Sequence, residues 1–247
     1  MKISVITVTF NSAATIEQTI NSVLDQTFKD IEYIIIDGGS TDGTIQIIEK
    51  YRSSLGKFIS ETDKGIYNAL NKGIKMATGD LIAFLHADDF YINQNILESY
   101  VTKFENENCE AIYADLYYVD QMNSNKIVRK WKSGMYQEGD FLKGWMPPHP
   151  TFIAKKSCYD KFGCYREDFN SAADYELMLR FIQKNKIKIS YLNDFVIKMR
   201  VGGESNKTLK NRIRANADDR RAWKVNNLSP GFFTLLLKPL RKVIQFF

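Results

Sequence analysis

The first 90 residues of the chain alternate short apolar runs with stretches of helical periodicity. In the helical stretches, apolar side chains such as Ile16, Ile20 and Val23 recur every three or four residues, which places them on one helix face. Such alternation is typical of strand-helix-strand units around a parallel sheet. The pattern therefore predicts an α/β fold. The strand-like runs occupy residues 3–10, 31–36, 57–60 and 81–85, and a helix is expected over residues 66–77.

The pattern in the second half of the chain is less regular. Two runs around Asn123 indicate a hairpin, and a Gly/Pro-rich stretch follows them. A helix and a long strand-like segment come next. In order, these elements occupy residues 111–119, 126–131, 144–150, 173–184 and 187–200.

A polar cluster follows each of the four strand-like runs in the first half. In an open parallel sheet, ligands bind outside the carboxyl ends of the strands, and these ends share one edge. Loops at the opposite ends show no such repeat of carboxylates. We therefore expect a binding site built from residues 9–11, 37–39, 61–64 and 86–89.

Asp88 and Asp89 are adjacent carboxylates at the end of the fourth run. Two neighbouring negative charges repel one another unless a cation lies between them. Oxygen ligands with few protein contacts suit Mg²⁺ or Mn²⁺ shared with phosphate oxygens. The alternative is that either aspartate caps the following helix. The other three clusters at the same edge favour a metal site.

Other polar residues at this edge suggest contacts with a nucleotide. Asp37 can accept a hydrogen bond from a base or ribose, and Gly39 lets the backbone approach a ligand closely. Lys64 and Lys72 are candidates to neutralise a diphosphate. The alternatives are an ordinary turn for Asp37 and Gly39, and solvated surface for the two lysines.

Two residues of the Gly/Pro-rich stretch are further candidates for ligand contacts. Trp145 could stack on a ligand or belong to the core. His149 could contact diphosphate or metal, or serve only the structure.

Composition and charge narrow the class of protein. Hydrophobic residues make up 44% and charged residues 26% of the 247 residues, which is typical of a globular protein and disfavours disordered, collagen-like and coiled-coil chains. The three cysteines have neither pairing nor metal-type spacing, which suits a reducing compartment. The first residues enter a strand-like run without signal-peptide features. We therefore expect a cytoplasmic protein.

The basic charge of the chain lies in its tail. Residues 207–247 contain ten Lys or Arg residues and two Asp residues, in a chain of net charge +5. From residue 232 onward, a helical wheel separates the aliphatic residues from Lys238, Arg241, Lys242 and Gln245, as in helices that lie in a membrane interface. The alternative is that this helix packs on its own domain or on a second copy of the chain. The sequence therefore leaves the oligomeric state undecided. A basic tail could also bind nucleic acid, but such binding would not use the aliphatic stripe, so we expect no nucleic-acid partner. The stripe consists of Phe233, Leu236, Leu237, Leu240, Val243, Ile244 and Phe247.

Several ordered motifs together resemble family 2 glycosyltransferases, in particular bacterial enzymes that assemble surface polysaccharides. The likeness extends over about residues 1–205. The motifs occupy residues 7–11, 36–44, 63–73, 79–80, 86–89, 149–152 and 173–180.

This resemblance implies a GT-A fold, which is a Rossmann-like sandwich with a mixed, mainly parallel sheet. It also implies a nucleotide-diphosphate sugar donor, a divalent metal, inversion at the anomeric carbon, and a glycan or lipid-linked acceptor. We expect a nucleotide-sugar-binding half over residues 1–90, an acceptor and catalytic half over 91–205, and a helical tail over 206–247. The tail would attach the enzyme to the inner face of the cell membrane.

The resemblance also implies roles for individual residues. Asp88 binds the metal and Asp174 is the base that takes the acceptor proton. The donor site comprises Thr9, Asn11, Asp37, Gly39, Asp63, Lys64, Lys72, His86 and Asp88. Trp145, which could stack on an acceptor sugar, and His149, which could contact the acceptor, are assigned to the acceptor side.

The chain departs from the family pattern at three positions. His86 stands where many members have a carboxylate, Gly38 where many have a second aspartate, and Ala173 where many have a glutamate before the base. Because of these departures, a nucleotide-sugar-binding protein without catalysis stays an alternative. The segment that begins at Asn11 is not Gly-rich, whereas a sugar nucleotidyltransferase or a nicotinamide dehydrogenase is expected to have a Gly-rich phosphate loop there. The sequence therefore disfavours both of these classes of enzyme.

Overall fold

The computed structural model of the chain describes residues 1–169, 171–202 and 209–245, with all of their side chains except those of residues 209–215 and 242–244. Within these ranges, nine strands form one sheet in the order β3-β2-β1-β4-β8-β6-β9-β5, and β7 pairs with β6 off this path. The strands are β1 (Ile3–Thr9), β2 (Ile31–Asp37), β3 (Lys57–Ser60), β4 (Leu81–Phe84), β5 (Phe90–Tyr91), β6 (Ala111–Val119), β7 (Ile127–Trp131), β8 (Ile153–Lys155) and β9 (Ile189–Arg200).

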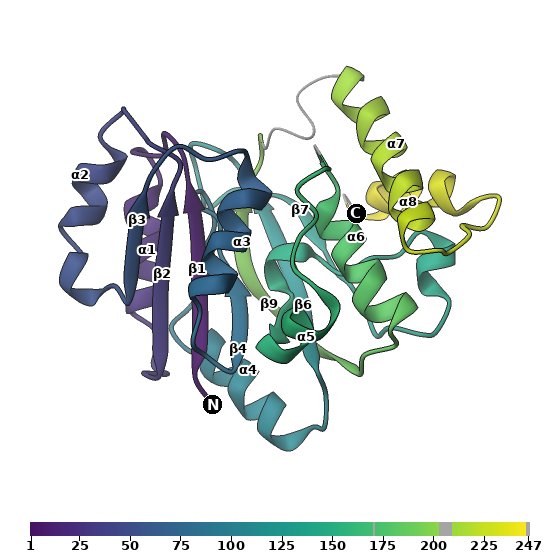
Figure 1. Cartoon of the computed structure of the whole chain (residues 1–247), viewed down its shortest axis with the longest axis horizontal. Coiled ribbons are helices and arrows are strands. Elements are labelled where there is room, and N and C mark those ends of the chain that lie inside the picture. Colours follow the sequence, from purple (N-terminus) through teal and green to yellow (C-terminus); the bar gives the residue numbers. More distant parts are fainter. Residues whose placement is uncertain (170, 203–208, 246–247) are drawn as a thin grey trace.

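Helices cover both faces of the sheet (Figure 1). Along β1, Ile3 and Val5 face one hydrophobic core, whereas Ile6 and Val8 face the other. Helix α3 packs on the second core and α1 on the first. The helices are α1 (Ile16–Leu24), α2 (Thr44–Glu49), α3 (Ile66–Met76), α4 (Ile96–Asn106), α5 (Lys156–Phe162), α6 (Ala173–Met178), α7 (Leu209–Val225) and α8 (Thr234–Ile244).

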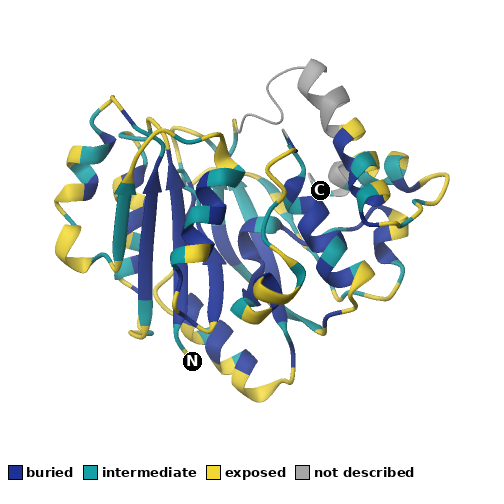
Figure 2. Cartoon of the chain, in the orientation of Figure 1, coloured by how far each residue is buried: buried dark blue, intermediate teal, exposed yellow. Residues whose placement is uncertain are grey.

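The first four strands pair in parallel, as the apolar pattern predicts. β1 lies between β2 and β4, and β3 pairs with β2 on its outer side. These strands are apolar along most of their length because both faces are covered, and Figure 2 shows the middle strands buried. The predicted strands at residues 3–10, 31–36, 57–60 and 81–85 are confirmed within one residue at each end.

The second half adds antiparallel strands to the same sheet. β8 pairs antiparallel with both β4 and β6, so it joins the two halves of the sheet. β6 and β7 form the predicted hairpin. The predicted helix over residues 173–184 begins as α6 and continues as a π-helical segment over Leu179–Lys184.

The described part of the tail packs on α6. The Trp223 Nε1–H group donates to Tyr175 Oη at 2.9 Å, and Asn226 Nδ2 donates to Glu176 Oε1 at 3.0 Å. All four of these residues are buried. The predicted boundary between residues 205 and 206 lies outside the described residues, so it stays a prediction.

Helix α8 differs from its predicted wheel at one position. Lys238, expected on the solvent face, points inward: its Nζ lies 2.6 Å from Asp219 Oδ1 and 3.5 Å from the centre of the Tyr175 ring. A buried carboxylate and an aromatic face together compensate the desolvated ammonium, which the wheel could not show. No described helix is long and apolar enough to cross a bilayer.

Gly73 marks the closest approach of α3 to β1. A methyl group added at this position would overlap Ile6 Cγ2 in the core. We expect Gly73→Ala to lower the free energy of unfolding by about 1–3 kcal/mol, because overpacking outweighs the better helix propensity of alanine. Urea denaturation would measure the change. Lys75→Ala, on the exposed side of the same helix, is the control, and equal stability of both variants would contradict this packing.

Candidate active site

The parallel register brings the predicted polar clusters to one edge of the sheet. Thr9 pairs with Asp37 and Asp37 with Ser60, so the ends of β1, β2 and β3 are level. β4 ends beside β1, where Leu85 N donates to Ile6 O at 3.1 Å, and His86 follows directly. The four clusters therefore surround one region of the surface.

Asp37 lies beneath this region, and its predicted contact with a base or ribose stays a prediction. Its side chain is fully buried. Oδ2 accepts hydrogen bonds from Gly39 N at 3.0 Å, Ser40 N at 3.0 Å and Ser60 Oγ at 2.6 Å. Oδ1 accepts a further bond from Ser40 Oγ at 2.5 Å. Asp37 therefore shapes the loop that faces the ligand.

Asn11 fixes the other side of the same loop. Its backbone, at φ 49°, is left-handed. Its N–H group donates to Ser40 Oγ at 2.7 Å, and its Oδ1 accepts from Thr41 N at 2.9 Å. Gly39, at φ 84°, needs the freedom that glycine provides. Asn11 and Gly39 therefore both have a structural role in this loop, and their predicted contacts with the donor stay predictions.

Lys72 is paired with carboxylates of its own chain. Its Nζ contacts Asp63 Oδ1 and lies 2.7 Å from Glu61 Oε1. Hydrogen bonds to Asp63 and then to Glu61 raise the pKa of Lys72. These two carboxylates offset the positive charge of Lys72, which was predicted to neutralise the diphosphate. Lys64, the other predicted lysine, is exposed.

Phe10 belongs to this edge, and the prediction from sequence included it in the cluster of residues 9–11 without giving it a role of its own. Its side chain is 63% exposed, although it directly follows a buried strand. A methyl group added at Gly38 would lie 3.4 Å from the Phe10 ring, so the ring stands beside the glycine loop. Thr9, which precedes it, has a buried hydroxyl without a hydrogen-bond partner. An aromatic residue at the end of an apolar run gives no signal that distinguishes it from the core.

The two adjacent aspartates occupy different environments. Asp88 is partly exposed, whereas Asp89 is fully buried. Burial, and then the charge of Asp88, raise the pKa of Asp89 well above its ordinary value, against a backbone hydrogen bond and the charge of Arg200. Asp88 is therefore the more accessible of the two carboxylates, and the predicted metal contacts of both residues stay predictions.

Two histidines lie between Asp88 and Asp174. The rings of His86 and His149 are 5.8 Å apart, and His149 Nδ1 lies 3.4 Å from Asp174 Oδ2. Burial and then His149 lower the pKa of His86 to about 4, against the opposing charges of Asp88 and Asp174. Burial also lowers the pKa of His149. Burial thus favours the neutral form of both imidazoles.

Asp174 lies in the first turn of α6, as predicted. The residue two positions before it, Ala172, is left-handed at φ 63°, and Ala173 N donates to Tyr67 Oη at 3.1 Å. The carboxylate itself is 24% exposed. The turn thus leaves a carboxylate accessible beside His149.

Trp145 lies in the core, which favours the alternative to its predicted stacking on an acceptor sugar. The side chain is 5% exposed, and its Nε1–H group donates to Ser133 O at 3.0 Å. Three other rings surround the indole with centroids 5.1–5.5 Å away. These rings belong to Tyr113, Tyr136 and Phe141.

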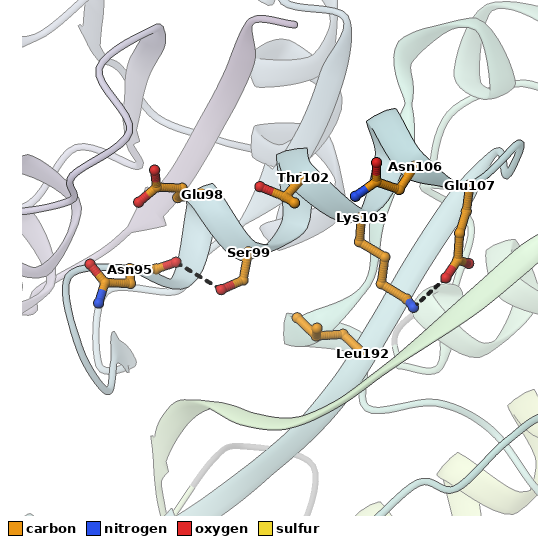
Figure 3. A pocket seen from close by; sticks show the side chains of 8 residues that line it. All are labelled: Asn95, Glu98, Ser99, Thr102, Lys103, Asn106, Glu107 and Leu192. Carbon is orange, nitrogen blue, oxygen red and sulfur yellow. Dashed lines mark hydrogen bonds and ion pairs between the residues drawn. The ribbon is translucent and has the colours of Figure 1, made fainter.

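A shallow groove lies elsewhere, along α4 (Figure 3). It runs between polar side chains of that helix and Leu192 of β9, and Lys103 pairs with Glu107 at 2.6 Å inside it. None of the residues that line it belongs to the strand-end clusters. The groove is therefore separate from the candidate active site.

Comparison with known proteins decides the family. The family model described as "Glycosyl transferase family 2" matches residues 4–164, which is more than half of the chain. The chain belongs to glycosyltransferase family 2. An uncharacterized glycosyltransferase of Mycobacterium tuberculosis is 31% identical over 180 residues, covering 72% of this chain and 68% of that protein.

A PGL/p-HBAD biosynthesis glycosyltransferase of Mycobacterium tuberculosis is 29% identical over 209 residues, which cover 82% of this chain and 78% of that protein. Among solved structures, S. aureus TarS 1-349 in complex with UDP-GlcNAc has a TM-score of 0.70 at 22% identity. That alignment covers 92% of this chain and 65% of the TarS chain. The mannosyltransferase PcManGT of Pyrobaculum calidifontis, in complex with GDP-Man and Mn²⁺, has a TM-score of 0.67 at 17% identity, and 96% and 68% of the two chains are covered.

These findings confirm the predicted fold and the predicted class of enzyme. The protein is a glycosyltransferase with the GT-A fold, and its mixed, mainly parallel sheet is the one described above. The strand-end edge is the part of this fold where the chain gathers its polar and ionisable side chains.

The structural role of Asp37 can be separated from a ligand contact. We expect Asp37→Ala to lower the free energy of unfolding by about 3 kcal/mol, because four donors lose a charged acceptor. Urea denaturation without ligand would measure this loss, and the exposed Asp30→Ala is the control. Unchanged stability together with weaker binding of nucleotide sugars would instead show that Asp37 serves the ligand.

Proposed function

We propose that this enzyme is an inverting, metal-dependent glycosyltransferase of bacterial surface-polysaccharide biosynthesis. It moves a hexose or related sugar from a nucleotide-diphosphate donor to a glycan or lipid-linked acceptor. The observation that carries this proposal is the contact of Asp174, at the start of α6, with His149, whose Nδ1 lies 3.4 Å from Asp174 Oδ2. Asp88, which follows β4 and is partly exposed, supplies a second carboxylate whose charge raises the pKa of the same histidine.

The two carboxylates suit the two charges that an inverting transfer develops. Asp174 takes the proton of the acceptor hydroxyl as that oxygen bonds to the anomeric carbon. The bond from the anomeric carbon to the diphosphate breaks on the opposite side, and negative charge grows on the departing phosphate. A divalent cation, Mn²⁺ or Mg²⁺, offsets this charge when it is bound.

The residues fit a cation that takes most of its ligands from the substrate. No three His, Cys, Asp or Glu side chains in the described part of the chain are placed to hold a metal by themselves. Asp88 is partly exposed and lies at the strand-end edge, so it offers a carboxylate from one side. Diphosphate oxygens would complete the coordination, as is common for Mg²⁺ in phosphate sites.

The donor half of the site offers an aromatic ring and an unpaired hydroxyl. The exposed ring of Phe10 is free to stack on a base, and Thr9 Oγ1 lacks a hydrogen-bond partner in the described structure. Asp63, Asn11 and Gly39 border the same loop. The neighbours TarS and PcManGT bind UDP-GlcNAc and GDP-Man, which supports a nucleotide-sugar donor without selecting the base.

Donor binding and turnover separate the roles of the two carboxylates. We expect Asp174→Asn to bind a UDP- or GDP-sugar with Mn²⁺ as the wild type does, but to reduce turnover about 10²- to 10⁴-fold, because the base is lost. Asp88→Asn is expected to lose the Mn²⁺-dependent part of donor binding. Calorimetry and release of nucleoside diphosphate would measure the two effects.

The wild type with a panel of donors and lipid-linked acceptors is the reference for this experiment. Donor binding without any glycoside formed, in wild type and variants alike, would establish a nucleotide-sugar-binding protein. Equal turnover of Asp174→Asn and the wild type would exclude Asp174 as the base.

We also propose that α8 attaches the enzyme to the inner face of the cell membrane, in the cytoplasm. Lys238 and the Thr234 hydroxyl fasten one side of the helix to the domain. The other side exposes large apolar side chains beside the partly exposed Arg241 and the exposed Lys143. This arrangement suits an anionic interface. The exposed fractions are 90% for Phe232, 61% for Phe233, 60% for Leu236 and 59% for Leu240.

Point substitutions test this attachment without removing the contacts of α8 with the domain. We expect Leu236→Glu and Leu240→Glu each to weaken binding to vesicles of phosphatidylcholine and phosphatidylglycerol by at least about tenfold, because an apolar side chain no longer enters the interface. Met122→Glu, at a position 93% exposed in the β6–β7 turn, is the control. Equal flotation of all variants with the vesicles would reject anchoring by α8.

A further inference from the structure

The carboxylate of Asp174 needs a partner that fixes its direction. Ala173, which precedes it, has no polar side chain. The neighbouring hydrogen bonds hold the backbone: Ala173 N donates to Tyr67 Oη at 3.1 Å, and Ser171 N and Oγ donate to Asp218 Oδ2 at 3.1 and 3.0 Å. These bonds place the start of α6 but do not orient the carboxyl group.

His149 contacts the carboxyl group itself. Its Nδ1 lies 3.4 Å from Asp174 Oδ2, and the two side chains are similarly accessible, at 26% and 24%. The ring of His86 is also close, with the ring centres 5.8 Å apart and the rings tilted by 53°. His149 therefore contacts Asp174 in the neighbourhood of a second imidazole.

The segment that carries His149 is rigid. His149, Pro150 and Thr151 form a 3₁₀ turn next to β8. The Thr151 side chain bonds Ala114 on β6 in both directions, accepting from its N–H group at 3.0 Å and donating to its carbonyl at 2.9 Å. Tyr100 Oη donates to Thr151 O at 2.6 Å. A turn fastened to β6 and α4 gives the imidazole a fixed position.

We propose that His149 is a positioning residue for Asp174. An N–H group at Nδ1 engages Asp174 Oδ2, which leaves Oδ1 to receive the proton of the acceptor hydroxyl. The inference rests on the proposed transferase activity and replaces the acceptor contact predicted for His149. A base held in one orientation meets the hydroxyl in line with the anomeric carbon, and loss of such positioning costs up to about 10²-fold in rate.

Two amide side chains distinguish this role from contacts made through the other ring nitrogen. The amide nitrogen of asparagine stands close to the place of histidine Nδ1, and that of glutamine close to the place of Nε2. If His149 acts on Asp174 through Nδ1, asparagine supplies the needed N–H group and glutamine does not. If His149 instead binds acceptor, metal or diphosphate through Nε2, glutamine is the better substitute.

The experiment compares kcat and the KM for donor and acceptor in His149→Asn, His149→Gln and His149→Ala. We expect kcat to fall about 10- to 100-fold in the Ala and Gln variants and only a few-fold in the Asn variant, with both KM values unchanged. Combined with Asp174→Asn, His149→Ala should cause no further loss, because the residue that it positions has gone. Thermal unfolding would verify that all variants are folded.

Several results would overturn the proposal. Better activity of the Gln variant than of the Asn variant would assign His149 to a contact through Nε2. A raised acceptor KM at unchanged kcat would assign it to acceptor binding, and an additive loss in the Asp174→Asn background would make its effect independent of the base. If the wild type transfers no sugar, the proposed function itself is refuted. The wild type is assayed first, so this outcome is distinguished from a failure of the role proposed for His149.

Discussion

The parallel pairing of β1 with β2 on one side and β4 on the other is the constraint on which the site depends. Backbone hydrogen bonds between parallel strands fix the register, so the strands end at one level. Each chain segment must leave the sheet there as a loop, and the loops carry the polar groups that the buried strands cannot. The edge is thus the one place where Thr9, the Asp37 loop and His86 come together.

Burial then divides these polar groups into those that build the site and those that face a ligand. Asp37 has four hydrogen bonds and Asp89 is buried, whereas Asp88 and Asp174 keep access to solvent. A carboxylate whose lone pairs are already used has fewer of them to offer a ligand. The imidazoles of His86 and His149 add further polar groups near the accessible carboxylates.

The described part of the tail packs on α6, the helix that carries Asp174. Trp223 of α7 and Asn226, which follows α7, bond to residues of α6, and Lys238 of α8 contacts the ring of Tyr175, the residue after Asp174. These contacts bury polar groups in pairs, which holds α8 in one orientation. The same orientation leaves Leu236 and the neighbouring apolar side chains exposed, so the helix is stably docked and still has an apolar face.

The sequence by itself determined the alternation of strands and helices, the edge at which the clusters meet and the position of Asp174 in its helix. These features follow from local hydrophobic period and from the rules of parallel sheets. Tertiary structure alone decided which side chains are accessible: Asp37 and Trp145 turned inward, Phe10 stayed exposed, and His149 came to lie beside Asp174. Burial and contact at these positions depend on segments far apart in the chain, about which local pattern carries no information.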